Sequence, residues 1–466
     1  MVTATAGAAR IVGMLAAMPP PPSSAPDDAP GDARVVRDRG DACPGALRLH
    51  AADDGHLARI RVPGGLLDVR QAAVLGLAAE RFGDGHLELT SRGNVQLRGL
   101  DDDCGARLAE LLGPAGLIPA PGHERVRNIV ASPLSGLSGL PGSATPGGTD
   151  ASGGAGHADV TPWVGELDRL LCASPWATAL SGRFLFALDD GRGDVAALDP
   201  DVTVLARPED RALVLLGSAA DAVEVPAADA VPAALHAARS FLDAAAAVGT
   251  RAWRVAELPA AHAPDAAELA ERLRTAGIPA ARVPEVRRPY APPPRPWGAG
   301  SRSIEHLYVL VPLGRLGVAQ WQVLTQVAGR GAGTLRLTPW RGVVLPRASA
   351  RRPVNGADRI RAAGLVLDPG SPWEGVTACT GRPGCAKSLA DVRADAAAVA
   401  DASPGPLPVH WSGCERRCGH PRGTAWVDVL ATGGGYELSV HGRPVPPGPD
   451  LATSLATARN HAPAER

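Results

Sequence analysis

The sequence predicts an α+β fold in which a small strand–helix–strand module and a larger α/β module each occur twice. Three observations support this prediction: an internal repeat, a proline-rich segment between its two copies, and four cysteines gathered in the second half. At 466 residues the chain is too long for one ordinary domain. Its 45% of apolar residues are enough for a sizeable core.

The internal repeat relates residues 56–97 to residues 306–345. Each copy starts with a short β-pattern ending at Val-Pro, continues with apolar residues at helical spacing, and closes with an alternating strand. Because such a unit cannot bury its faces alone, we expect the two copies to pair with each other. The matching positions are Pro63 with Pro312, Val69 with Val318, Gln71 with Gln320, Leu75 with Leu324, and Leu87, Leu89 and Thr90 with Leu335, Leu337 and Thr338.

A longer α/β stretch follows each copy. In the first stretch, residues 125–131 and 183–188 are strand candidates, and the Ala-rich residues 233–247 predict a helix. The second stretch ends in two alternating segments, residues 424–430 and 436–440, which predict strands. The order along the chain is therefore small module, large module, small module, large module.

Segments of low complexity mark the boundaries between these modules. Residues 1–40 are rich in Ala, Pro, Asp and Gly and predict a disordered leader, whereas the Gly- and Ser-rich residues 132–157 predict a flexible insertion. Residues 286–300 are dense in proline and predict a semi-rigid linker. The predicted modules are then 43–110, 120–285, 301–365 and 366–445, followed by a tail at 446–466.

The charge balance excludes two classes of partner. With 47 basic and 48 acidic residues the formal net charge is −1, which gives no overall attraction to nucleic acid or to an anionic membrane.

No apolar run reaches the roughly twenty residues that span a bilayer. Residues 8–18 lack the basic start and clean apolar centre of a signal peptide. We therefore expect a cytoplasmic protein without nucleic-acid or membrane partners.

Four of the seven cysteines form one pattern: Cys379 and Cys385 as C-x5-C, then, after 28 residues, Cys414 and Cys418 as C-x3-C. Four thiolates arriving as two pairs can hold an iron–sulfur cube, because each iron takes one soft ligand. Glycines and prolines beside them allow the backbone to turn tightly: Gly381, Pro383, Gly384, Gly413, Gly419 and Pro421. The pattern favours a 4Fe-4S cluster.

Three other interpretations of these cysteines stay open. Structural zinc also takes four thiolates, but its pairs are usually two to four residues apart. Two disulfides would suit a secreted protein, and nothing marks this chain as secreted. Four unrelated buried thiols would share this spacing only by coincidence. The remaining Cys43, Cys104 and Cys172 have no partner at ligand spacing.

The cysteine spacing and the module order resemble the sulfite and nitrite reductase superfamily and, within it, the precorrin-3B synthases. The resemblance extends over about residues 43–445. The segments that carry it are CPGALR at 43–48, LTSRGNVQLRGL at 89–100, RNIVASPLSG at 127–136, SGRFLFALDDG at 181–191, ACTGRPGCA and SGCERRCGHP. It implies that each small module is a ferredoxin-like half-domain, and that the last large module binds the 4Fe-4S cluster.

In the reductases these motifs surround sirohaem and bind an anion above its iron. The resemblance places the T-x-R arginine at Arg92, the R-N arginine at Arg127 and a third basic position at Arg183. The fourth position, a lysine in the reductases, is Leu185 here. Sulfite reduction needs dense positive charge, so this leucine favours another ligand. Arg127 precedes an apolar strand and needs a partner there; we favour a ligand over an internal salt bridge.

Precorrin-3A is a sirohaem-like tetrapyrrole whose acetate and propionate groups suit arginines. The resemblance implies that it fills the sirohaem position, with Arg92, Arg127 and Arg183 as catalytic and substrate-binding residues. The additional polar contacts would come from Asn94, Gln96, Arg98 and Asn128.

The implied reaction hydroxylates precorrin-3A at C20 with dioxygen and forms a γ-lactone in aerobic cobalamin (vitamin B12) biosynthesis. The implied enzyme is an iron–sulfur monooxygenase, and the cluster would relay electrons to an oxygen-activating centre, either a further non-haem iron or sirohaem. No nucleotide-binding loop is evident in the sequence, so the donor would be an NADH-dependent reductase or a ferredoxin. The alternative is a sirohaem-dependent assimilatory sulfite or nitrite reductase.

Overall fold

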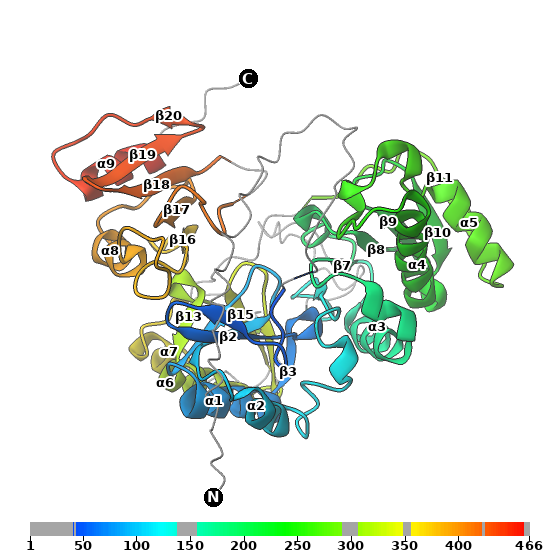
Figure 1. The fold of residues 1–466 in the computed structure, drawn as a ribbon, viewed down its shortest axis with the longest axis horizontal. Coiled ribbons are helices and arrows are strands. Elements are labelled where there is room, and N and C mark those ends of the chain that lie inside the picture. Colours follow the sequence, from blue (N-terminus) through cyan, green and yellow to red (C-terminus); the bar gives the residue numbers. More distant parts are fainter. Residues whose placement is uncertain are drawn as a thin grey trace, which may run out of the picture.

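A computed structural model describes residue 41 and residues 43–137, 156–290, 306–347, 356–421 and 425–460. The expected leader, most of the flexible insertion and most of the linker lie outside these residues. Figure 1 shows the two large modules on either side, in green and in orange to red, with the two half-domains below them in blue and yellow-green. The α+β prediction is confirmed.

The two half-domains have the same order of elements. The first contains β1 (His50–Ala52), β2 (Gly55–Ile60), β3 (Leu66–Asp68), α1 (Val69–Phe82), β4 (His86–Leu89), β5 (Val95–Leu100) and α2 (Gly105–Leu112). The second contains β12 (His306–Leu310), β13 (Arg315–Gly317), α6 (Val318–Arg330), β14 (Thr334–Leu337), β15 (Gly342–Pro346) and α7 (Ala357–Ala362).

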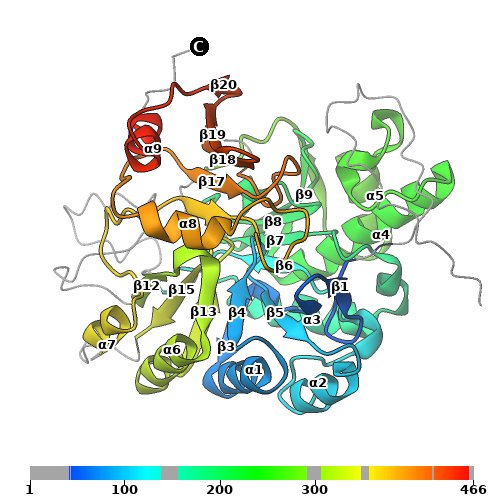
Figure 2. The same cartoon turned by 60° about the vertical axis from the view of Figure 1, so that its left-hand side comes forward.

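The half-domains exchange one strand each, which confirms that the two copies pair. Strand β13 of the second copy runs antiparallel to β4 of the first, as Figure 2 shows, and β3 of the first copy runs antiparallel to β14 of the second. The resulting sheets have the orders β1-β2-β5-β4-β13 and β12-β15-β14-β3. Helices α1 and α6 pack together, and the buried Trp321 Nε1 donates to the Ala72 carbonyl at 2.6 Å.

The matched glutamines of the repeat have the same local role. The Gln71 side chain accepts a hydrogen bond from the amide of Asp68 at the start of α1, at 3.1 Å. The Gln320 side chain accepts from the amide of Gly317 at the start of α6, at 3.0 Å. Each glutamine satisfies an amide that the first helical turn leaves unpaired.

The first large module is a six-stranded sheet of order β11-β10-β9-β8-β7-β6. Strands β6, β7 and β8 are parallel, and the rest of the sheet is antiparallel. Its elements are β6 (Ile129–Ala131), α3 (Thr161–Ala173), β7 (Phe186–Asp189), β8 (Val202–Arg207), β9 (Arg211–Leu216), β10 (Ala222–Pro226), α4 (Ala230–Val248), α5 (Ala266–Thr275) and β11 (Ala281–Val283). Strand β7 begins later than predicted, because the Phe184 amide closes a turn onto the Ser181 carbonyl at 3.0 Å.

The second large module repeats this pattern on a smaller scale, with β16, β17 and β18 parallel and β19 and β20 antiparallel. Its elements are β16 (Val376–Ala378), α8 (Val392–Val399), β17 (Val409–Ser412), β18 (Val427–Thr432), β19 (Gly435–Val440), β20 (Arg443–Pro444) and α9 (Leu451–Arg459). Helix α9 falls within the expected tail, yet its Leu455 and Ala458 are buried in the core of this module. None of the described helices combines the length and the apolar character that crossing a membrane requires.

Candidate iron–sulfur site and adjoining cavity

The four motif cysteines lie in loops at one edge of the last sheet. Cys379 directly follows β16 and Cys414 follows β17, and these strands are parallel, so their carboxyl ends meet at the same edge. Burial raises the pKa of the Cys418 thiol, and the nearby sulfurs of Cys414, Cys379 and Cys385 raise it further. The fold therefore brings together the four thiols that the sequence pattern singled out.

The sulfurs of the four cysteines are not gathered as closely as one tetrahedral zinc ion would hold them. All four cysteines are free thiols, and among the described residues no three of their sulfurs lie within 4.8 Å of one another. Tetrahedral zinc, with Zn–S bonds of about 2.3 Å, would bring its ligands to about 3.8 Å from each other. A cube holds one thiolate on each of four irons and spreads the sulfurs further apart.

Polar groups beside the cysteines also suit a cluster. The Gly413 amide donates to Cys379 Sγ at 3.2 Å, an interaction of the kind that tunes a cluster-bound thiolate. The Ser412 hydroxyl, two residues before Cys414, is buried and has no hydrogen-bond partner among the described residues. A buried hydroxyl of this kind is a spare donor for a bound group.

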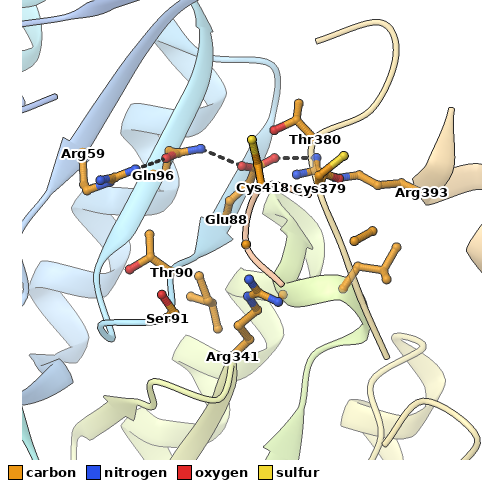
Figure 3. A pocket seen from close by; sticks show the side chains of 15 residues that line it. Arg59, Glu88, Thr90, Ser91, Gln96, Arg341, Cys379, Thr380, Arg393 and Cys418 are labelled. Carbon is orange, nitrogen blue, oxygen red and sulfur yellow. Dashed lines mark hydrogen bonds and ion pairs between the residues drawn. The ribbon is translucent and has the colours of Figure 1, made fainter. Parts of the chain in front are cut away.

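A cavity of about 230 Å³ opens between the cysteine loops and both half-domains. Figure 3 shows Cys379 and Cys418 on one side of it and side chains of the half-domains on the other. It is lined by Arg59, Glu88, Leu89, Thr90, Ser91, Gln96, Leu313, Gly314, Arg341, Ala378, Cys379, Thr380, Arg393, Cys418 and Gly419. Three modules thus contribute to one site.

A chain of hydrogen bonds crosses the cavity wall (Figure 3). Arg59 donates to the Gln96 side-chain oxygen at 2.9 Å, and the Gln96 amide donates to Glu88 at 2.8 Å. Arg393 donates to the other oxygen of Glu88 at 2.5 Å and, through Nε, to the carbonyl of Cys379 at 3.3 Å. The first half-domain is thereby connected to the backbone of a cysteine loop.

The cavity is positively charged. Three guanidinium groups, of Arg59, Arg341 and Arg393, line it together with one carboxylate, that of Glu88. Arg341 has a positive φ of 60°, and its guanidinium has no hydrogen-bond or ion-pair partner in the part of the chain that the structure describes. Burial lowers the pKa of Arg341, and the charge of Arg393 lowers it further. An unpaired, partly desolvated cation favours an anionic ligand.

Besides Cys379 and Cys418, two of the sequence-predicted residues lie at or beside this cavity. Gln96 lines it, and Arg92 belongs to the same turn as the lining residues Thr90 and Ser91. Arg92 donates to the Gly182 carbonyl at 3.3 Å. Burial and the neighbouring charges of Arg254 and Arg61 lower its pKa to about 10.

Arg127 is bound within the protein. Its guanidinium donates to both oxygens of Asp168, at 2.6 and 2.7 Å, and to the Leu117 carbonyl at 2.9 Å. Only 3% of the residue is exposed. Arg127 therefore forms the internal salt bridge that the sequence analysis considered as the alternative to ligand binding. The guanidinium nitrogens that a ligand would need are occupied by Asp168.

The remaining predicted residues lie in other surroundings. Arg183 is exposed, with its guanidinium 4.8 Å from the centre of the Trp253 ring. Asn94 and Asn128 are buried and hydrogen-bonded to each other at 3.3 Å. Arg98 contacts a cysteine loop and not the cavity. Leu185 is 4% exposed in a small apolar cluster with Val130, Ala187 and Val195, against which Trp340 packs.

The four charged residues that line the cavity were absent from the sequence prediction: Arg59, Glu88, Arg341 and Arg393. For one of them, Arg341, the internal repeat contains an indication. The repeat matches Thr90 with Thr338, and an arginine follows each threonine within three residues, Arg92 in one copy and Arg341 in the other.

Comparison with known proteins supports the half-domain and the fold. Residues 50–113 match the nitrite/sulfite reductase ferredoxin-like half domain. The chain is 27% identical over 436 residues to precorrin-3B synthase from Sinorhizobium sp, covering 88% of this chain and 85% of the relative. It is 27% identical over 409 residues to ferredoxin–nitrite reductase from Synechococcus elongatus, covering 78% and 74%. The Mycobacterium tuberculosis NirA protein shares the fold, with a TM-score of 0.58 at 18% identity over 86% of this chain and 79% of that one. The chain is therefore similar to precorrin-3B synthase and to the nitrite reductases, and its residues 50–113 match the ferredoxin-like half domain of the nitrite/sulfite reductases.

Proposed function

We propose that this protein is an oxidoreductase that binds an anionic tetrapyrrole at the cavity beside the four cysteines and acts as a precorrin-3B synthase. Precorrin-3A would be hydroxylated at C20 by dioxygen, with the ring A acetate closing a γ-lactone. One oxygen atom enters the substrate, and the other leaves as water with two electrons and two protons from an external donor. The observation that carries the proposal is that Cys379 and Cys418 share a cavity with the unpaired Arg341.

The cavity arginines would bind the carboxylates of the substrate. Arg341 offers a free fork, whereas the terminal nitrogens of Arg59 already donate to the Gln96 side chain at 2.9 Å and to Cys43 Sγ at 3.8 Å. Arg92, which contacts a backbone carbonyl but no carboxylate, would extend the positive surface beyond the cavity. Bidentate pairing with a carboxylate offsets the cost of holding these cations out of water.

The cysteines Cys379, Cys385, Cys414 and Cys418 would hold a 4Fe-4S cluster, which supplies single electrons when bound. Because Cys379 and Cys418 line the cavity, the electron path from the cysteine site to a bound tetrapyrrole would be short. An NADH-dependent reductase or a ferredoxin would deliver the electrons to the protein.

A further iron finds no suitable ligand set among the described residues. The three carboxylates of Asp189, Asp190 and Asp194 are buried within 4.8 Å of one another. However, Asp189 accepts backbone hydrogen bonds on both of its oxygens, and Asp190 is paired with Arg192. Since these oxygens are already occupied by protein donors, we assign no metal to them.

Two features favour oxygenation of a tetrapyrrole over reduction of a small anion. Leu185 is enclosed by apolar side chains where the reductases carry a lysine, and the guanidinium of Arg127 is occupied by Asp168. Two of the four anion-binding positions therefore offer no free cation. Sulfite or nitrite reduction would lack the charge that stabilises its substrate.

The test begins with anaerobically purified protein. Its visible spectrum and its iron and sulfide content report the cluster, and incubation with precorrin-3A, a chemical reductant and ¹⁸O₂ reports the reaction by mass spectrometry. We expect one ¹⁸O atom in the product. Copurifying sirohaem with nitrite or sulfite turnover and no change in precorrin-3A would support the reductase instead, and a colourless zinc protein would exclude both functions.

A further inference from the structure

The peptide groups on both sides of Cys385 are hydrogen-bonded to the first half-domain. Arg98 Nη2 donates to the Gly384 carbonyl at 2.9 Å, and the Ala386 amide donates to Asp53 Oδ2 at 2.6 Å. These pairs are separated by 286 and 333 residues in the sequence. One module therefore holds the backbone of a cysteine that belongs to another module.

The residues that make these contacts are themselves fixed. Asp54 accepts from Arg98 Nε at 2.8 Å and from Arg98 Nη2 at 2.7 Å, and Arg98 is only 5% exposed. Asp53 and Asp54 form the two-residue turn of the β1–β2 hairpin, in which Ala52 pairs with Gly55. A bidentate ion pair on a short hairpin has few alternative geometries.

The contact depends on the absence of a side chain at Gly384. A Cβ atom at this position would lie 2.7 Å from the Asp54 carboxylate and 3.2 Å from Arg98 Nη2. Any side chain there would displace the ion pair from the backbone. The glycine beside Cys385 thus allows the close approach of Asp54 and Arg98.

The other cysteines are anchored within their own module. The Cys379 amide donates to the Trp411 carbonyl at 2.9 Å, and the Cys418 carbonyl lies 3.1 Å from His410 Nε2. Cys414 follows β17 after one residue. Among the four, Cys385 is the one whose flanking peptides are both held by another module in the described structure.

We propose that Asp53, Asp54 and Arg98 form a clamp that positions Cys385 as a cluster ligand, so that the first half-domain controls how firmly the cluster is held and at what potential it is reduced. The inference rests on the cluster of the proposed function, but not on the identity of the substrate. Hydrogen bonds that orient a ligand affect both the affinity and the potential of a bound group.

The experiment compares full-length Asp54→Asn and Arg98→Lys with wild type. Lysine keeps the charge but cannot bond Asp54 and the Gly384 carbonyl through one planar fork. The control is Asp103→Asn, because Asp103 pairs with Arg107 on the exposed surface of the same half-domain. Cluster loss to a chelator is followed by absorbance, an alkylating reagent traps released thiols, and peptide mass spectrometry identifies them. A redox titration gives the midpoint potential.

We expect both clamp variants to lose the cluster about tenfold faster than wild type, because each loses one charge-assisted hydrogen bond. Cys385 should be the first cysteine to be alkylated, and the midpoint potential of the cluster should shift. The control should match wild type. Unchanged loss, or equal alkylation of all four cysteines, would overturn the proposal. If either variant misfolds, Asp53→Asn, a milder change in an exposed turn, should show the same order of alkylation.

Failure of the clamp and failure of the proposed function give different results. A wild-type protein that holds a cluster but leaves precorrin-3A unchanged would overturn the function and still allow the clamp to be measured. A wild-type protein without iron and sulfide would overturn both.

Discussion

Arg341→Met removes the unpaired cation of the cavity and keeps most of its side-chain packing. If Arg341 binds a substrate carboxylate, the variant loses a charge-assisted interaction of about 1.5–3 kcal/mol, which weakens tetrapyrrole binding about 10- to 150-fold. Because no described residue pairs with this guanidinium, no protein partner is left unsatisfied by its removal. The free energy of unfolding should therefore change by less than about 0.5 kcal/mol, or rise slightly.

The assay titrates a carboxylate-bearing tetrapyrrole into wild-type and variant protein by fluorescence quenching, at low and high salt, beside denaturant unfolding of both. Arg341→Lys is the matched control, since it keeps the charge and loses the fork; its affinity should fall between the other two. Two results would refute the reasoning: unchanged affinity in Arg341→Met, or a loss of stability above about 2 kcal/mol, which would indicate a structural role.

Three further predictions concern the cluster, a buried ion pair and pH. Cys385→Ser should abolish the cluster, and iron and sulfide content at wild-type levels would contradict the ligand assignment. Asp168→Asn should destabilise the fold by about 3–5 kcal/mol in denaturant unfolding, because it leaves the buried Arg127 without a counterion; a change below about 1 kcal/mol would oppose this. Burial and the nearby charges of Arg192 and Arg336 lower the pKa of His306 from 6.5 to about 4. Between pH 6.5 and about pH 4 the unfolded chain therefore binds a proton at this histidine that the folded chain does not. The free energy of unfolding should fall as the pH drops through this range. His306→Leu should flatten that pH dependence in unfolding experiments, and an unaltered slope would exclude His306 as its source.

The sequence predicted those parts of the fold that depend on local pattern. Helix α4 and strand β19 follow directly from periodicity, and the two glutamines of the repeat, Gln71 and Gln320, have equivalent roles in the structure. The exchanged strands β3 and β13 were not predicted, because each has three residues, too few to carry a periodic signal.

The sequence could predict only those site residues that belong to a regular or repeated sequence pattern. Cysteine spacing identified four thiols, and the second copy of the threonine turn could have indicated Arg341. In contrast, the partner of Arg127 lies 41 residues away on α3, and Glu88 meets Arg393 across 305 residues. Such pairs depend on how the modules pack, and no local pattern contains that information.

The strand exchange has a consequence for synthesis on the ribosome. Strand β4 is complete early, but its neighbour β13 is made much later, since Arg315 follows Asp84 by 231 residues. At translation rates of about 5–20 residues per second, this edge waits roughly 10 to 50 s for its partner. The first large module, which is encoded in between, has its own core and can fold during that interval. An unpaired strand edge is prone to mispairing, so the nascent first half-domain is the stage at which we expect chaperone dependence and aggregation to concentrate.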